Sequence, residues 1–304
     1  MTENGKNGGR LARRILLAGD GSDDANAAAR AAADLARLAC ADLHVVHVWQ
    51  PSLVPLPGEA GETAAQERAQ SILERMLDAV RARGAHVAVG HLRSGRAADE
   101  ILACAEEIDA DLVVVGSRGL GALQRTVVGS VSEAVVHHST RPVLVLRAVA
   151  GAWPPVHVVI GDDASADARK AGELAARIGK AFGTDAVVVR ALSTLPRMLD
   201  GDSDSDAHTV DDALDVAEVS LASRARELEP MLGQRPHVHV AIDDPAAALV
   251  SVASSDETPA LIAVGTRGLG ALQRWRFGSV STDVLRSAPG AVLINAHPRD
   301  TRDS

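Results

Sequence analysis

The sequence of 304 residues has few cysteines and no long apolar run. Its two cysteines, Cys40 and Cys104, lie in alanine-rich stretches without metal-ligand spacing, so we interpret them as small buried hydrophobic residues. No apolar segment reaches the roughly 18 residues that a membrane helix needs, and the N-terminal segment lacks the apolar stretch of a signal peptide. We therefore expect a cytoplasmic protein without a membrane partner.

Aromatic residues are also scarce, at 2% of the chain with no tyrosine, so few side chains could stack on nucleic-acid bases. Lys and Arg together number 31 against 40 Asp and Glu, which gives a net charge of −9. This balance disfavours sequence-independent binding to a polyanion, and we expect no nucleic-acid partner. A small anionic ligand remains compatible with the charge, because a local backbone site can outweigh it.

The sequence contains an internal repeat of two similar copies. The segment VGSRGLGALQRTVVGSVSEAV at 115–135 recurs as VGTRGLGALQRWRFGSVSTDV at 264–284, with fifteen of 21 positions identical. A hydrophobic content of 46% is enough for two separate cores. The predicted organisation is a disordered N-terminus at 1–10, a first domain at 11–148, a linker at 149–155, a second domain at 156–297 and a disordered tail at 298–304.

Each copy alternates short runs rich in Val, Ile and Leu with longer alanine-rich segments of helical period. Strands expected in the first copy are 15–18, 43–49, 85–91, 112–115 and 142–147; those in the second are 156–160, 186–191, 238–242, 261–264 and 291–295. Parallel neighbouring strands need crossover connections, so this alternation predicts a parallel sheet with helices on both faces. The expected fold class is α/β, with two tandem doubly wound domains.

Glycines follow the fourth expected strand of each copy. Gly116-x-x-Gly119 is followed after nine residues by Gly129-Ser130, which opens a helix, and the second copy repeats this pattern. Ligands bind beyond the carboxyl ends of parallel strands, where glycine lets backbone N–H groups approach a phosphate. The unpaired N–H groups at a helix start favour an anion at the same place. The spacing predicts a cradle for a triphosphate.

The first strand ends in the segment from Ala18 to Ser22, AGDGS. Neither a P-loop of the G-x-x-x-x-G-K-[ST] type nor a dinucleotide G-x-G-x-x-G pattern is present. Opposite a phosphate cradle, the carboxylate of Asp20 suits a ribose hydroxyl better than a phosphate, which it would repel. The alternative is that Asp20 and Ser22 cap the following helix, and the two interpretations are compatible.

These motifs resemble the nucleotide-binding pattern of the universal stress proteins in a tandem, two-domain form, over about Leu11 to Ala296. The resemblance implies five-stranded domains of order 3-2-1-4-5 that bind ATP, with or without Mg²⁺, across strands one and four. It implies that Asp20 meets the ribose and that the backbone of Val46 meets adenine. It also implies an internal pseudo-dimer and a homodimer of chains.

Carried over by position, the expected nucleotide-binding residues of the first copy are Ala18, Gly19, Asp20, Gly21, Ser22, Val46, Val115, Gly116, Arg118, Gly119, Gly129, Ser130, Val131 and Ser132. Those of the second copy are Asp163, Val189, Val264, Gly265, Arg267, Gly268, Gly278, Ser279, Val280 and Ser281. Two interpretations stay open for the four arginines near the cradles: they offset phosphate charge, or they are solvated loop residues. These arginines are Arg118, Arg125, Arg267 and Arg274.

The second copy departs from the pattern near its first strand. Ala164 replaces a glycine, Asp162 adds a carboxylate, and alignment places Asp244 where the first copy has Gly95. Because like charges close together repel, these changes predict weaker nucleotide binding in the second domain.

No metal ligands or catalytic residues are expected, since no obvious catalytic base accompanies the cradle. The function predicted first is a non-catalytic, ATP-binding regulatory protein of the stress response, with the stress role resting on the resemblance alone. One alternative is a slow ATPase or a protein that phosphorylates itself at Ser130 or Ser132. A second alternative is a nucleotide-free protein-interaction module, in which the glycines serve only tight packing.

Overall fold

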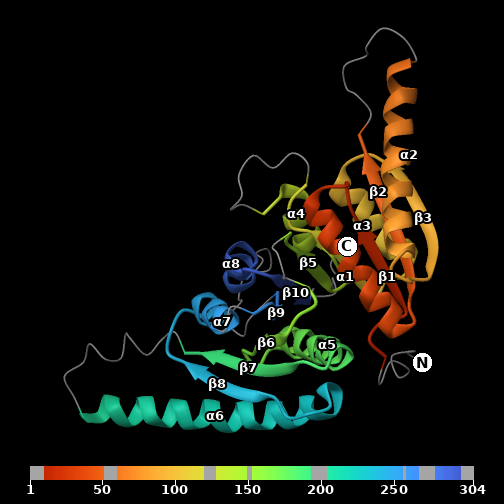
Figure 1. The fold of residues 1–304 in the computed structure, drawn as a ribbon. Coiled ribbons are helices and arrows are strands. Elements are labelled where there is room, and N and C mark those ends of the chain that lie inside the picture. Colours follow the sequence, from red (N-terminus) through yellow and green to blue (C-terminus); the bar gives the residue numbers. More distant parts are fainter. Residues whose placement is uncertain are drawn as a thin grey trace, which may run out of the picture. The chain divides into compact units, whose positions relative to one another are not determined.

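The computed structural model describes residues 10–50, 60–119, 128–148, 153–192, 204–255, 258–266 and 278–295 (Figure 1). Contacts divide the chain into two compact units, one of 1–153 with 296–304 and the other of 154–295. The segments predicted to be disordered, except for Arg10, and residues 149–152 of the predicted linker lie outside the described residues. No helix among the described residues is long and apolar enough to cross a membrane.

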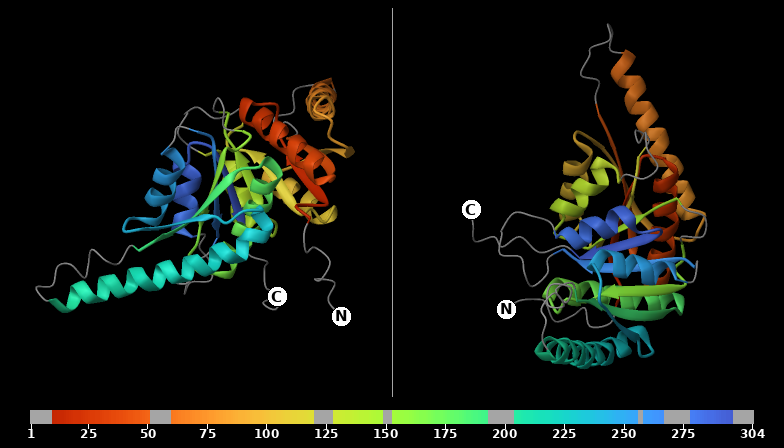
Figure 2. Two further views of the ribbon diagram at one scale, coloured as in Figure 1. Left: turned by 60° about the horizontal axis from the view of Figure 1, so that its bottom comes forward. Right: turned by 90° about the vertical axis from the view of Figure 1, so that its left-hand side faces the viewer.

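The first unit alternates strands and helices along its whole length. Its elements are β1 (Arg14–Ala18), α1 (Asp23–Ala39), β2 (Asp42–Trp49), α2 (Ala60–Arg81), β3 (Val87–Ser94), α3 (Ala97–Glu107), β4 (Leu112–Gly116), α4 (Ser130–His138) and β5 (Val143–Leu146). The strands are parallel and lie in the order β3-β2-β1-β4-β5. Helix α1 packs against α2, and α3 against α4, so that the two pairs cover the two faces of the strands (Figure 2).

The second unit repeats this scheme. Its elements are β6 (His157–Gly161), α5 (Ala166–Phe182), β7 (Asp185–Ala191), α6 (Asp204–Leu232), β8 (His237–Ala241), α7 (Pro245–Ser254), β9 (Ala260–Gly265), α8 (Ser279–Ser287) and β10 (Ala291–Asn295). The strands are again parallel, in the order β8-β7-β6-β9-β10.

The fold is α/β with parallel strands and covering helices, as the alternation predicts. The expectation of two separate five-stranded sheets is wrong, because the ten described strands belong to a single sheet. A five-stranded sheet ends in edge strands whose backbone N–H and C=O groups are open to further pairing, so the number of strands in a repeat does not fix where a sheet ends.

The core of the first unit follows from its apolar runs. Ile15, Leu16 and Leu17 of β1 are fully buried, as expected for a central parallel strand covered on both faces. Helix α1 turns a face of alanines toward the strands, and Ala28 and Ala32 have no exposed surface. Because these side chains are small, the backbone of α1 lies close to β4.

The turn between the first strand and the first helix has one geometry in both units. Asp20 Oδ1 accepts a hydrogen bond from the N–H of Ser22 at 3.0 Å, and Asp163 Oδ1 accepts one from the N–H of Ser165 at 2.9 Å. The two serines are the N-caps of α1 and α5, where their hydroxyls accept backbone hydrogen bonds. The capping interpretation of the Asp-x-Ser segment therefore describes the turn.

The residue between aspartate and serine has a left-handed backbone, with a φ of 81° at Gly21 and 64° at Ala164. A Cβ costs energy in this region and glycine avoids the cost, so Ala164→Gly should stabilise the second unit by about 1 kcal/mol. Gly21→Ala should destabilise the first unit by a similar amount. Thermal unfolding should show shifts of roughly 2–4 °C in opposite directions. Shifts in the same direction would contradict this account.

Candidate functional site

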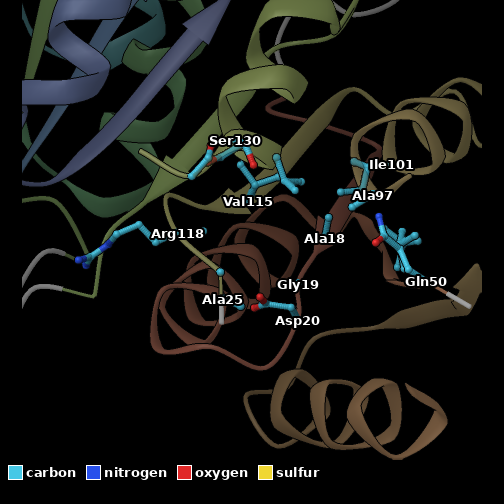
Figure 3. A pocket seen from close by; sticks show the side chains of 17 residues that line it. Ala18, Gly19, Asp20, Ala25, Gln50, Ala97, Ile101, Val115, Arg118 and Ser130 are labelled. Carbon is cyan, nitrogen blue, oxygen red and sulfur yellow. The ribbon is translucent and has the colours of Figure 1, made fainter. Parts of the chain in front are cut away.

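A cavity of about 410 Å³ lies at the carboxyl ends of β1 and β4 in the first unit (Figure 3). All of the predicted residues of the first copy line it, except Gly21 and Ser22, which form the adjoining turn. Further lining residues, not predicted from the sequence, are Ala25, Val48, Gln50, Ala97 and Ile101. The alternation of side chains along β2 could have indicated Val48, which shares a face with Val46. The α3 residues had no signal in the sequence.

One end of the cavity is apolar. Ala18, Val46 and Val115 come from three neighbouring strands, and Ile101 and Ala97 come from α3. In Figure 3, Ile101 and Ala97 lie together at the end of the cavity away from Arg118. Such a surface suits a flat aromatic ring, because burying apolar area is favourable and needs no polar partner.

Beyond the apolar end, the carboxylate of Asp20 faces the loop that follows β4. A Cβ at Gly119 would stand 2.5 Å from Asp20 Oδ2, which is closer than real contacts allow. Glycine at this position therefore keeps the carboxylate in place beside the loop backbone. A carboxylate accepts hydrogen bonds from hydroxyl groups, so this position fits a sugar.

Gly116 has a packing role. A Cβ there would lie 2.7 Å from both Ala25 N and the carbonyl carbon of Asp24, in the backbone of α1. Gly265 has the same relation to α5, with a Cβ position 2.5 Å from Ala168 N. For these two glycines the close approach of a helix to a strand explains the residue type without a ligand.

Helix α4 begins without a capping side chain, since its N-cap is Gly129. The N–H of Gly129, predicted to face phosphate, instead donates to the carbonyl of Ser117 at 2.7 Å. The hydroxyl of Ser132 is also engaged, with Oγ 2.7 Å from the Ser117 carbonyl and 2.9 Å from the Gly129 carbonyl. Ser130 is exposed on the lining, and the N–H groups of 130–132 have no carbonyl of their own helix to bond.

The side chain of Arg118 points away from the cavity in Figure 3. Its guanidinium pairs with the buried carboxylate of Asp24, with Nε 3.0 Å from Oδ2. The ion pair with Asp24, which neither interpretation of this arginine included, sets the direction of its side chain. No signal in the sequence pointed to this partner, because Asp24 lies 94 positions before Arg118.

The second unit carries charge where the first has none. Asp162, 7% exposed, stands at the position of Gly19, and Arg190 stands at the position of His47. Arg190 forms an ion pair with Asp162, and the N–H of Asp162 donates to the carbonyl of Val189 at 2.9 Å. The extra carboxylate expected from the sequence therefore has a partly buried cationic partner.

The pairing registers of β3 and β8 correct one alignment. They place Asp243, and not Asp244, at the position of Gly95. Asp244 is the N-cap of α7, where its carboxylate accepts hydrogen bonds from the N–H groups of Ala246 and Ala247 at 2.9 and 3.0 Å. Asp244 therefore caps the start of α7, and the alignment of Asp244 with Gly95 is wrong.

Most predicted residues of the second copy lie at the ends of β6, β7 and β9 and at the start of α8: Asp163, Val189, Val264, Gly265, Gly278, Ser279, Val280 and Ser281. Helix α8 begins like α4, because its N-cap Gly278 donates its N–H to the carbonyl of Thr266 at 2.9 Å. Arg125, Arg267, Gly268 and Arg274 lie outside the described residues. Across the described ranges, no group of three or more His, Cys, Asp or Glu could hold a metal ion.

A family model described as the universal stress protein family matches residues 12–147 and again 156–295. The chain belongs to this family, in a tandem form.

Relatives of the tandem chain match at full length and at half length. A curated universal stress protein of Mycobacterium tuberculosis is 29% identical over 317 residues, covering 94% of this chain and 96% of its own. One from Thermus aquaticus is 39% identical over 139 residues, covering 44% of this chain and 98% of its own. The crystal structure of a universal stress protein from Archaeoglobus fulgidus covers 93% of this chain and 98% of its own at 22% identity. Its TM-score of 0.66 shows a shared fold.

The two serines at the start of α4 should differ in their effects. Ser132→Ala removes a buried hydroxyl that bonds two carbonyls and should lower the free energy of unfolding by about 1 kcal/mol. Ser130→Ala removes an exposed hydroxyl and should leave stability within about 0.5 kcal/mol of the wild type. Chemical denaturation of both variants tests this, and equal losses would contradict the assignment of Ser132 to the framework.

Proposed function

We propose that the first unit binds ATP and that this universal stress protein is a non-catalytic, ATP-binding regulator of the stress response. The observation that carries the proposal is the succession of features along one cavity. The apolar end of the cavity, formed by Ala18, Val46, Val115, Ala97 and Ile101 and here called the apolar slot, adjoins the Asp20 carboxylate. The start of α4, which has no capping side chain, follows. A nucleotide has three matching parts in the same order: base, sugar and phosphates. The stress role rests on membership of the family.

In the proposed complex the base lies in the apolar slot beside the backbone of Val46. The Val46 carbonyl accepts a hydrogen bond from the N–H of Gly19 at 3.2 Å, and its second lone pair can accept one from an amino group of adenine. Asp20 accepts from the ribose, with Oδ1 already bonded to the N–H of Ser22 and Oδ2 turned toward Gly119. Both contacts favour a nucleoside over a simple anion.

The phosphates lie between Gly119 and the first turn of α4. The N–H groups of Ser130, Val131 and Ser132 supply donors, and the partial positive charge of the helix start attracts the anion. Gly129 contributes by forming the N-cap, since its own N–H is used by the protein. Mg²⁺ would accompany the nucleotide on its phosphates, as is usual for this ion.

Among the alternatives, self-phosphorylation is favoured by the exposed hydroxyl of Ser130 on the cavity lining. Ser132 is a poor acceptor for that reaction, because its hydroxyl is buried and bonded to two carbonyls. Gly116 supports the alternative of a nucleotide-free interaction module, because close packing against α1 is enough to explain why this residue is glycine. Bonds within the protein also account for Gly129 and Ser132, but not for the apolar end of the cavity or the N–H groups at the start of α4, and we retain nucleotide binding.

We further propose that the protein acts in the cytoplasm, that its two repeats form an internal pseudo-dimer, and that chains associate as a homodimer. The tandem match to the family fits the pseudo-dimer.

The first test is Gly119→Asp. A carboxylate at this position would stand beside Asp20 and in the space proposed for phosphate, where charges about 4 Å apart repel by roughly 4 kcal/mol at an effective dielectric of 20. ATP affinity measured by calorimetry should fall by about 100-fold or more.

The matched control is Gly183→Asp, which adds the same carboxylate in the second unit, where nothing lies within 4 Å of the new Cβ. Aspartate tolerates the left-handed backbone of that position better than most residues. ATP affinity should be unchanged in the control. Wild-type protein without measurable affinity, or equal affinity in Gly119→Asp and wild type, would end the proposal.

The second test counts the sites. The charged pair of Asp162 and Arg190 and the strained backbone of Ala164 should weaken nucleotide binding at the second site relative to the first. The expected difference is at least about tenfold, or roughly 1.4 kcal/mol. Titration should give one tight site for each chain, and that site should vanish in Gly119→Asp. Two sites of equal affinity would contradict the assignment.

A further inference from the structure

We infer that Asp24, on the first turn of α1, is a positioning residue of the nucleotide site. It holds Ser117 and Arg118, which follow β4 directly, so that the start of α4 is placed to receive phosphate, and it does not itself line the cavity. The inference rests on the proposed function, because it names a residue that acts on the same site. No sequence motif pointed to Asp24, which reads as one of two acids that open a helix.

Asp24 is 2% exposed, and both of its carboxylate oxygens are used. Oδ2 accepts from the hydroxyl of Ser117 at 2.7 Å and from Nε of Arg118 at 3.0 Å. Oδ1 accepts from a terminal nitrogen of Arg118 at 3.2 Å and from the N–H of Ala148 at 2.8 Å. One side chain of α1 therefore ties together the segments that follow β4 and β5.

The contacts of Asp24 continue into the cradle through Ser117. The carbonyl of Ser117 accepts the N–H of Gly129 and the hydroxyl of Ser132, each at 2.7 Å. The carbonyl of Arg118 accepts the hydroxyl of Ser22, the N-cap of α1, at 3.1 Å. Moving the Ser117–Arg118 peptide would therefore shift the start of α4 relative to Gly119, and with it the N–H groups proposed to bind phosphate.

The charge of Asp24 is maintained in the folded protein. Burial alone would raise the pKa of this carboxyl, but hydrogen bonds from Arg118, Ser117 and the Ala148 N–H, with the charge of Arg118, hold the pKa below its usual value. The same pairing raises the pKa of Arg118. The carboxylate and guanidinium thus stay ionised together at neutral pH, and Arg118 supports the loop through Asp24.

The second unit supplies a matched control. Asp167 occupies the same place on α5, is 4% exposed, and accepts a hydrogen bond from the hydroxyl of Thr266 at 3.2 Å. Thr266 follows β9 as Ser117 follows β4. Asp167 resembles Asp24 in burial and setting but belongs to the other unit.

The experiment compares Asp24→Asn with Asp167→Asn in the full chain, by calorimetry with ATP and by thermal unfolding. Both variants should unfold at a lower temperature than wild type. Only Asp24→Asn should lose ATP affinity at the first site, by about tenfold or more. Arg118→Gln should show a similar loss, and the double variant should lose little more than either single variant, since one interaction is removed in each case.

Three results would overturn the inference: unchanged or increased ATP affinity in Asp24→Asn, an equal affinity loss in Asp167→Asn, or losses that add in the double variant. Increased affinity would mean that Arg118, once released, binds phosphate itself.

Hydrogen exchange without nucleotide separates this inference from the proposed function. The N–H of Gly129 should exchange faster in Asp24→Asn than in wild type, whether or not the wild type binds ATP, and no change there would also overturn the inference. If Asp24→Asn does not fold, Arg118→Gln carries the same measurements, and Arg118→Lys should restore part of the affinity.

Discussion

The backbone of the strand that ends at Gly116 lies against the backbone of the first turn of α1, and the site of the first unit depends on this approach. A Cβ at Gly116 would be 2.7 Å from main-chain atoms of α1. Because the helix start is this close, Asp24 reaches Ser117, Arg118 and Ala148 at once. The apolar slot, the Asp20 turn and the start of α4 then meet at one edge of the strands, beyond their carboxyl ends.

The same scaffold has diverged between the two units. Gly265 keeps the close approach to α5, and Asp167 keeps the place of Asp24. The end of β6 differs from the end of β1, because the buried Asp162 forms an ion pair with the partly buried Arg190 where the first unit has Gly19 and His47. Removing Arg190 would leave the buried carboxylate of Asp162 without its ion-pair partner, which is costly in a protein interior. The residues that pack the helix against the strand are therefore similar in the two units, whereas the charged residues near the proposed site differ. This difference indicates that folding and ligand binding constrain different residues.

The hydrophobic period of the sequence predicts the α/β alternation, and the glycine spacing predicts the part of the cavity lining that follows β4 and begins α4. The strand order within each unit and the lining by Val46 are implied by the family resemblance. The sequence does not reveal the partner of Arg118, which is an acid 94 positions away, nor the bond from Ser132 to the Ser117 carbonyl. It also misplaces Asp244, since a one-residue shift in β8 is invisible until strands are paired. The sequence does not show which polar groups bond to one another. That pairing depends on which distant segments of the chain come together in the folded protein.

The charges of the described cavity lining determine which groups could bind the phosphates of the proposed nucleotide. Among the described residues that line the cavity, Arg118 carries the only positive side chain, and its charge is committed to Asp24. The proposed phosphate donors are therefore backbone N–H groups and the hydroxyl of Ser130, which offer partial charges fixed in direction. Phosphoryl transfer needs charge that neutralises the transition state and a group that orients the nucleophile. In the proposed complex, the backbone donors of the described cradle would hold the phosphates in place, which is compatible with a regulator whose state depends on whether nucleotide is bound.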